Sequence, residues 1–136
     1  MADVASLNPR WRGTLPDHLG MVHEVVAPGH VTGHFKVEKH HMAANGYLHA
    51  ASIIALVDSA CGIGSMTALP EGATGFTTLE LKTNYLGSAQ DGTVTCEARL
   101  THGGRTTQVW DATATHVESG KVLALFRCTQ MILYPR

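Results

Sequence analysis

Hydrophobic and polar residues alternate along most of the chain, in short runs that are separated by glycine and proline. Two early runs, residues 21–27 and 31–39, flank Pro28-Gly29 and predict a pair of strands. Four longer β-rich runs occupy the second half, at residues 75–86, 92–101, 106–117 and 121–133. The last two breaks between them are short enough for hairpins, so we expect a four-strand antiparallel meander there.

Between the two groups of strands lies a run with a different pattern. Residues 49–68 are rich in Ala, Ile, Leu and Val, contain no proline, and stop before Leu69-Pro70-Glu71-Gly72. The run therefore predicts a helix of about five turns. Its apolar residues go nearly all the way round, which is typical of a helix buried on most sides. The sequence thus predicts a single α+β domain whose sheet curls around one helix.

Composition narrows the class of protein. The chain has 136 residues, of which 44% are hydrophobic and only 15% are charged. Part of this apolar surface is expected between subunits, because interface cores are depleted of charge; a large core is the alternative. A net charge of −1 provides no basic field for nucleic acid and no patch for a membrane.

The N-terminal residues, the cysteines and the long apolar stretch indicate where in the cell the protein is located. We expect residues 1–17 to be an irregular arm before a domain at 18–136, and the arm lacks the apolar core of a signal peptide. Cys61, Cys96 and Cys128 lie in apolar runs and predict buried free thiols. The long apolar stretch at 48–69 carries Asp58 near its middle, which a membrane span would not readily accept. We therefore expect a soluble protein of the cytoplasm.

Asp58 is the strongest candidate for chemistry. It is the only Asp, Glu, Lys or Arg between Lys39 and Glu71. An isolated carboxylate in apolar surroundings costs several kcal/mol unless it is paired, hydrated or protonated. Groups perturbed in this way gather at functional sites. The alternative is that Asp58 caps a neighbouring turn or points into solvent.

The start of the helix offers a second group. Asn45-Gly46-Tyr47-Leu48-His49 precedes it, so the amides of Ala50 and Ala51 are expected among the first N–H groups without a helical partner. Such donors suit a carbonyl oxygen that becomes an oxyanion. His49 is then a site residue, or else simply a packed or capping histidine.

Other patterns are weaker. The nine histidines include adjacent His40 and His41, but no zinc motif, Cys/His cluster or paired carboxylate accompanies them. We therefore expect no metal and no cofactor. His102-Gly103-Gly104-Arg105 is a hairpin turn whose arginine could meet a phosphate.

Gly46-x-x-His49-Ala50-Ala51, followed by Leu56-Val57-Asp58, resembles the hotdog-fold acyl-CoA thioesterases, specifically the phenylacetate-degradation (PaaI-like) branch. That family has G-x-x-H-G-G with an acid nine residues after the histidine. The resemblance spans roughly residues 20–133 and continues through Thr77-Thr78-Leu79-Glu80-Leu81, Asn84-Tyr85-Leu86 and Gly104-Arg105.

The resemblance implies a hotdog domain that hydrolyses an acyl-CoA. Asp58 attacks the thioester or activates water, the Ala50 amide polarises the carbonyl, and His49 orders the loop and the substrate. Further substrate contacts are implied at Asn45, Gly46, Thr77 and Thr78, and the CoA phosphates are expected near Gly104, Arg105 and Lys82.

Two chains are needed for this chemistry. Ala50 and Asp58 are eight residues apart, or about 12 Å along one helix. A carbonyl must lie within roughly 3–3.5 Å of both groups. We therefore expect a homodimer, or a dimer of dimers, in which the acid of one chain faces the amide of the other.

The sequence departs from the family in three respects. Ala50-Ala51 replace Gly-Gly, which reduces backbone freedom. Many members carry an amide side chain where this chain has Ala43, and Asn45 is the nearby substitute. Gly62 stands where some branches place a hydroxyl. Two other functions stay open because fold alone does not fix function, namely a hotdog hydratase or dehydratase and a non-catalytic acyl-CoA-binding module.

Overall fold

The alternating runs form one six-stranded antiparallel sheet in the computed structural model, which describes residues 8–136. The strands are β1 (Val22–Ala27), β2 (His30–Lys36), β3 (Gly75–Tyr85), β4 (Thr93–Gly103), β5 (Thr107–His116) and β6 (Val122–Leu133). Each lies within about two residues of its expected bounds, except at the end of β2. There Val37 is no longer in the strand, and its N–H donates to the Gly92 carbonyl oxygen at 2.8 Å.

The order of the strands corrects the predicted four-strand meander. The sheet runs β1-β2-β4-β5-β6-β3, so only β4, β5 and β6 form a meander and β3 pairs with β6. The reason is that β2 and β5 occupy both edges of β4 and leave no edge for β3. The connection from β3 to β4 is also held by hydrogen bonds in a course that does not form a hairpin. Within it, the Leu86 N–H donates to the Leu123 carbonyl oxygen, and the Ala89 carbonyl oxygen accepts from the Leu48 N–H.

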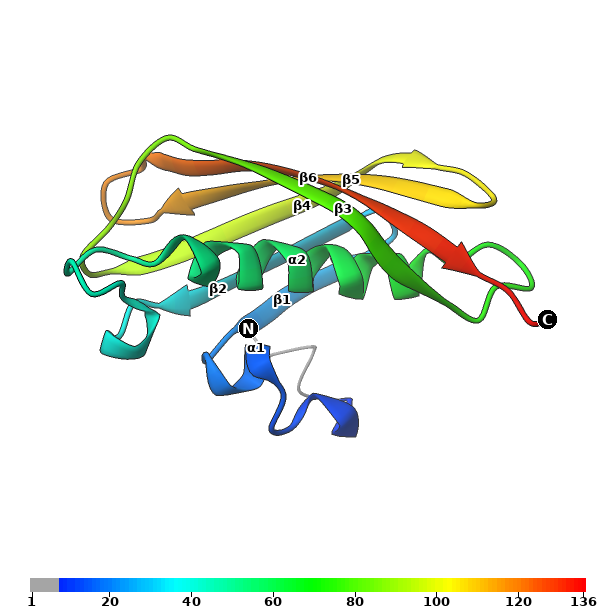
Figure 1. Cartoon of the computed structure of the whole chain (residues 1–136), viewed down its shortest axis with the longest axis horizontal. Coiled ribbons are helices and arrows are strands. Elements are labelled where there is room, and N and C mark those ends of the chain that lie inside the picture. The colour runs from blue at the N-terminus through cyan, green and yellow to red at the C-terminus, as the bar shows by residue number, and fades with distance from the viewer. Residues whose placement is uncertain (1–7) are drawn as a thin grey trace.

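The predicted helix is confirmed as α2 (Ala50–Thr67), which lies along the concave face of the sheet (Figure 1). Small side chains on that face allow the close approach. Ala98 in β4, Ala112 and Ala114 in β5, and Ala124 in β6 are all buried there. Leu56 and Val57 of α2 are fully buried in the same core. The sheet therefore wraps around one helix, as expected for this α+β arrangement.

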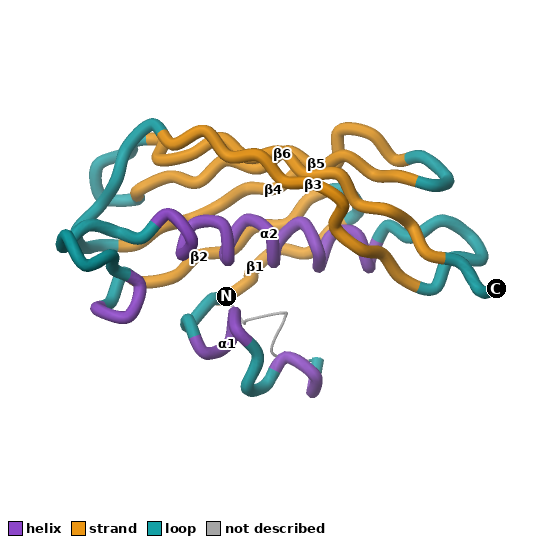
Figure 2. The backbone as a smooth tube through the Cα atoms, viewed as in Figure 1, coloured by secondary structure: helices purple, strands orange, loops and turns teal. Residues whose placement is uncertain are grey.

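The described part of the arm is more ordered than the predicted irregular segment. It contains the short helices η2 (Pro9–Trp11) and α1 (Leu15–His18), and residues 1–7 lie outside the described part of the chain. Figure 2 shows the arm beside β1, on the same side of the sheet as α2. The Trp11 ring packs edge-on against His23 of β1, with centroids 5.4 Å apart. The arm is therefore packed onto the domain.

Candidate active site

Asp58 lies on α2 as a half-buried carboxylate in apolar surroundings. Its Oδ1 is buried and has no hydrogen-bond partner within residues 8–136. Burial raises the pKa of Asp58 above its usual value. Asp58 therefore neither caps a turn nor points freely into solvent, and its carboxylate is left available for a ligand.

The start of α2 is capped by His49, and this corrects one expectation. The His49 Nδ1 accepts from the Ala51 N–H at 2.9 Å, so the Ala51 amide is not free. An accepting Nδ1 places the proton of the neutral ring on Nε2, which remains a donor. The Ser52 N–H also bonds back, to the His49 carbonyl oxygen. Within residues 8–136, nothing accepts from the Ala50 N–H, so of the two amides expected to be free only that of Ala50 is free.

His41, in the short helix η3 (Lys39–His41), anchors this loop. Its carbonyl oxygen accepts from the His49 N–H at 2.9 Å and from the Ser52 Oγ at 2.8 Å. Its buried ring accepts from the Glu38 N–H at Nδ1 and donates from Nε2 to the Leu19 carbonyl oxygen. Burial lowers the pKa of His41, which favours the neutral ring that these two bonds require. The loop that positions His49 is thus tied to the arm.

Tyr85 is a second support that sequence reasoning missed. Its hydroxyl donates to the Ala50 carbonyl oxygen at 2.9 Å, which ties the end of β3 to the first residue of α2. Tyr85 appeared in the sequence only as part of a resembling segment. No local pattern could have revealed a contact between residues 35 positions apart.

Asn45 and Gly46 form the turn that leads to His49. The Asn45 Oδ1 accepts from the Tyr47 N–H at 3.1 Å, and Gly46 has a φ of +84°, which favours glycine. The Ala43 N–H donates across this turn to the Tyr47 carbonyl oxygen at 2.7 Å. The side-chain oxygen of the exposed Asn45 is therefore used within the turn.

Thr77 and Thr78 point to opposite faces of the sheet. Thr78 lies opposite Gln130, which is fully buried on the helix side. Thr77 lies opposite Met131, which is exposed on the outer side. Because side chains alternate along a strand, only Thr78 shares the face of α2.

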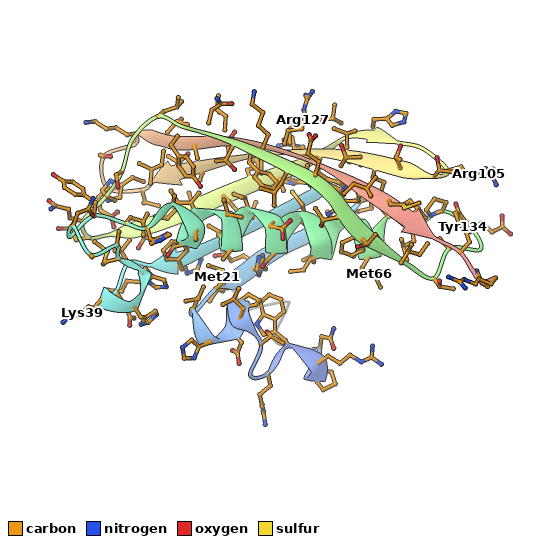
Figure 3. All side chains as sticks on the ribbon, in the orientation of Figure 1. Met21, Lys39, Met66, Arg105, Arg127 and Tyr134 are labelled. Atoms are coloured by element: carbon orange, nitrogen blue, oxygen red, sulfur yellow. The ribbon has the colours of Figure 1, made fainter. Side chains whose placement is uncertain are left out.

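The expected phosphate contacts are not gathered in one place. Arg105 is exposed at the β4–β5 hairpin, at one end of the molecule, and Gly104 closes that hairpin by donating to the Thr107 carbonyl oxygen (Figure 3). Lys82 lies opposite Arg127 on the outer face of the sheet, and Figure 3 shows Arg127 near the middle of that face. Lys82 and Arg105 therefore do not form a single cationic patch.

The cysteines are free and buried, as predicted. Burial raises the pKa of the Cys96 thiol to about 12, and a hydrogen bond with Cys128 raises that of Cys61. Cys61 and Cys96 are therefore not activated nucleophiles, because a reactive cysteine needs a lowered pKa. Among residues 8–136, no three His, Cys, Asp or Glu side chains are grouped to hold a metal ion.

Comparisons with known proteins identify the family to which the chain is similar. The profile of the Thioesterase superfamily matches residues 45–123. The chain is 38% identical over 84 residues to 1,4-dihydroxy-2-naphthoyl-CoA hydrolase of Listeria monocytogenes, which is 62% of this chain and 67% of that protein.

Two solved structures are also similar. A mutant of the thioesterase PA1618 from Pseudomonas aeruginosa has a TM-score of 0.88 and 28% identity, covering 98% of this chain and 95% of that one. A hypothetical thioesterase from Streptococcus pneumoniae, solved with coenzyme A, has a TM-score of 0.76 and 26% identity over 85% of this chain and 88% of that one. These similarities show that the sheet wrapped around α2 is a hotdog fold.

Proposed function

This chain belongs to the thioesterase superfamily, and on that premise we propose that it hydrolyses an acyl-CoA thioester to a free acid and CoA. The observation that supports this most is Asp58, a half-buried carboxylate in the middle of α2 whose buried Oδ1 has no hydrogen bond within residues 8–136. The proposal includes the phenylacetate-degradation branch, a cytoplasmic location and the absence of a cofactor.

Asp58 supplies the reactive carboxylate. Its oxygen either attacks the thioester carbonyl, to give an anhydride that water then cleaves, or takes a proton from the attacking water. Both routes end with the CoA sulfur leaving and the oxygen of water in the acid. A carboxylate whose pKa is raised by burial is a better base than an exposed one, since its pKa lies closer to neutral pH.

The Ala50 N–H supplies the oxyanion donor. It lies at the positive end of α2, and Tyr85 and His41 hold the backbone on either side of it. About 12 Å of helix axis separates Ala50 from Asp58, so the donor for each acid comes from a second copy of the chain. His49, with its free Nε2–H, is proposed to order the substrate beside that donor.

The proposal that the substrate contains CoA is supported by two similar proteins. One relative is named as a hydrolase of an aromatic acyl-CoA and another was solved with coenzyme A. Arg105 is exposed and can meet a phosphate of CoA in two-point contact, whereas Lys82 on the outer face is the weaker candidate. Asn45, Gly46 and Thr78 complete the proposed substrate contacts, and Thr77 is least suited because it faces away from α2.

The test is an Asp58→Asn variant assayed on a panel of acyl-CoAs without added metal. The amide is nearly the same size but can neither attack nor accept a proton, so kcat should fall by at least about 10²-fold. Asp91→Asn, at an exposed site, is the matched control and should keep wild-type turnover. Near-wild-type turnover by a folded Asp58→Asn protein would exclude this role.

The same panel separates the other two functions. An enoyl-CoA hydration assay run beside the hydrolysis assay detects a hydratase. If the acyl-CoAs bind to the wild-type protein but none is hydrolysed or hydrated, the protein is a binding module and the thioesterase proposal fails.

A further inference from the structure

A cavity of about 450 Å³ lies beside the second half of α2. Its volume is in the range of small-molecule sites, and its walls are predominantly apolar. The walls come from four parts of the chain, the arm, β1, α2 and β3, through Asn8, Trp11, Val26, Ser59, Gly62, Ile63, Met66, Thr67 and Phe76.

The cavity begins next to Asp58. Ser59 follows the acid directly, and Gly62 lies one turn further along the helix, or about 6 Å along its axis. An acyl group whose carbonyl is held at Asp58 therefore has only a short way to reach the cavity. Met66, labelled in Figure 3, also lines the cavity and lies eight residues after Asp58, or about 12 Å further along the helix axis.

Phe76 shapes the wall on the side of β3. A Cβ atom at Gly62 would lie 3.2 Å from the Phe76 Cζ, so the ring rests against the helix where a side chain is missing. This is the position at which some family branches place a hydroxyl. Compared with those branches, this chain therefore lacks a polar group near the acid and has the aromatic ring of Phe76 against the helix instead.

Trp11 forms the wall on the side of the arm, and it is held there by several contacts. Its ring meets His23 at an interplanar angle of 89°. Its carbonyl oxygen accepts from the Thr14 N–H at 3.1 Å and from the Thr14 Oγ at 2.6 Å, while its N–H donates to the Asn8 carbonyl oxygen. The profile of the superfamily begins only at residue 45, so this wall lies outside the matched region.

We propose that the cavity takes the apolar tail of the acyl group and that Trp11 limits how long this tail can be. The inference rests on the proposed thioesterase function and adds the residue that sets its acyl-length preference. Removing the indole would join the cavity to the space of the arm and admit longer chains. An apolar pocket discriminates between substrates that differ by one methylene by about 10–200-fold, so a change in the depth of the pocket should change the preferred chain length.

The experiment compares kcat/KM for acetyl-, butyryl-, octanoyl- and dodecanoyl-CoA in the full-length wild type and in Trp11→Ala. We expect the ratio of dodecanoyl to butyryl to rise at least about 10-fold in Trp11→Ala. Arg12→Ala is the matched control in the same arm, since Arg12 is exposed and does not line the cavity, and its ratio should stay at the wild-type value.

A second variant tests the opposite direction. Ser59→Phe places a ring inside the cavity at a partly exposed helix position, and the ratio of octanoyl to acetyl should fall. If Trp11→Ala lowers kcat/KM equally for all four thioesters, Trp11 only holds the arm and the inference is wrong, although the thioesterase function stands. If the wild type hydrolyses none of these four but does hydrolyse other members of the wider acyl-CoA panel, the inference about the apolar tail is wrong. If it hydrolyses no member of that panel, the proposed function itself has failed.

Discussion

At the scale of residues, the candidate site is recognised by one charged group, the carboxylate of Asp58. Asp58 is surrounded by apolar residues in the sequence, and the structure gives its buried Oδ1 no hydrogen bond within residues 8–136. Buried polar groups are normally paired, so an unpaired carboxylate is costly and needs a reason. The proposed function gives that reason, because the same burial that destabilises the charge makes the carboxylate a better base.

The pH dependence of activity follows from this burial. Because the pKa of Asp58 is raised, its carboxyl group is still protonated at a pH where an exposed aspartate, with a pKa of about 4, is already charged. We expect kcat/KM to fall as the pH decreases through the raised pKa, with an acid limb above pH of about 4. A pH profile on one acyl-CoA measures this. An acid limb at or below the ordinary value would contradict it.

Stability should show the opposite sign. The folded state holds the Asp58 proton more tightly than the unfolded chain, so the carboxyl group stabilises the fold at low pH relative to neutral pH. This contribution is lost as the pH rises from the unfolded value of about 4 through the raised folded pKa. Asp58→Asn should therefore raise Tm by a few degrees at neutral pH, and the gain should shrink toward pH 4. Thermal unfolding of both proteins across this range measures it, and Asp91→Asn serves again as the control.

At the scale of elements, α2 depends on two glycines with different neighbours. A Cβ atom at Gly64 would lie 2.8 Å from the Cζ2 and Cζ3 atoms of Trp110, which is itself fully buried. The Trp110 Nε1 donates to the Gln108 Oε1, and the Gln108 Nε2 donates to the Ala68 carbonyl oxygen at the end of the helix. The indole therefore has no room to move, whereas Phe76 opposite Gly62 lies half-buried on the edge strand β3.

The two glycines should respond differently to substitution. Gly64→Ala overpacks the core against Trp110 and should destabilise the protein by about 1–3 kcal/mol, despite the better helix propensity of alanine. Gly62→Ala needs only a small shift of Phe76 and should be neutral or stabilising by up to about 1 kcal/mol. Urea unfolding of the pair measures the difference. Equal effects at both positions would show that Trp110 adapts and that α2 is packed less tightly than described.

The start of α2 is an element built from distant parts of the chain. His41 holds the loop before it, His49 caps it and Tyr85 ties its first carbonyl. Together they fix the direction of the Ala50 N–H, the only donor of the pair of alanines that remains free within residues 8–136. Rigid positioning of this kind is what an oxyanion donor requires.

At the scale of the whole molecule, the two halves of the proposed site, the donor N–H and the carboxylate, lie far apart within one chain. The helix is continuous from Ala50 to Thr67, so the donor and the acid of one chain cannot meet at one carbonyl. The surface is consistent with a second copy. The edge strand β3 exposes Leu79 and Leu81, at 58% and 38%, and Leu86 beyond it is 60% exposed. Burial of these exposed leucines against a second copy would remove their apolar surface from water.

We therefore expect a homodimer, or a dimer of dimers, with two shared sites. Light scattering during size-exclusion chromatography measures the assembly. Complementation tests the sharing: Asp58→Asn chains are mixed with Ala50→Pro chains, in which proline removes the donor N–H at a helix position that tolerates it. Mixed dimers should recover one working site of two. A fully active monomer, or no recovery in proven heterodimers, would refute the shared site.

The sequence by itself determined the elements and the acid. Alternation marked six strands, the apolar run from 49 to 68 marked the helix, and the lone charge within that run marked Asp58. These predictions succeed because they depend on local periodicity and on the cost of a single buried charge, both of which can be counted along the chain.

Only the tertiary structure decided which segments meet. It put β3 beside β6, because β4 already had neighbours on both edges, and it brought Tyr85 to Ala50 and Trp11 to the cavity beside α2. It also separated Thr77 from Thr78 and gave the Ala51 amide to His49. Such contacts join residues far apart in the chain or depend on the orientation of one ring, so they follow from packing in three dimensions and leave no periodic trace in the sequence.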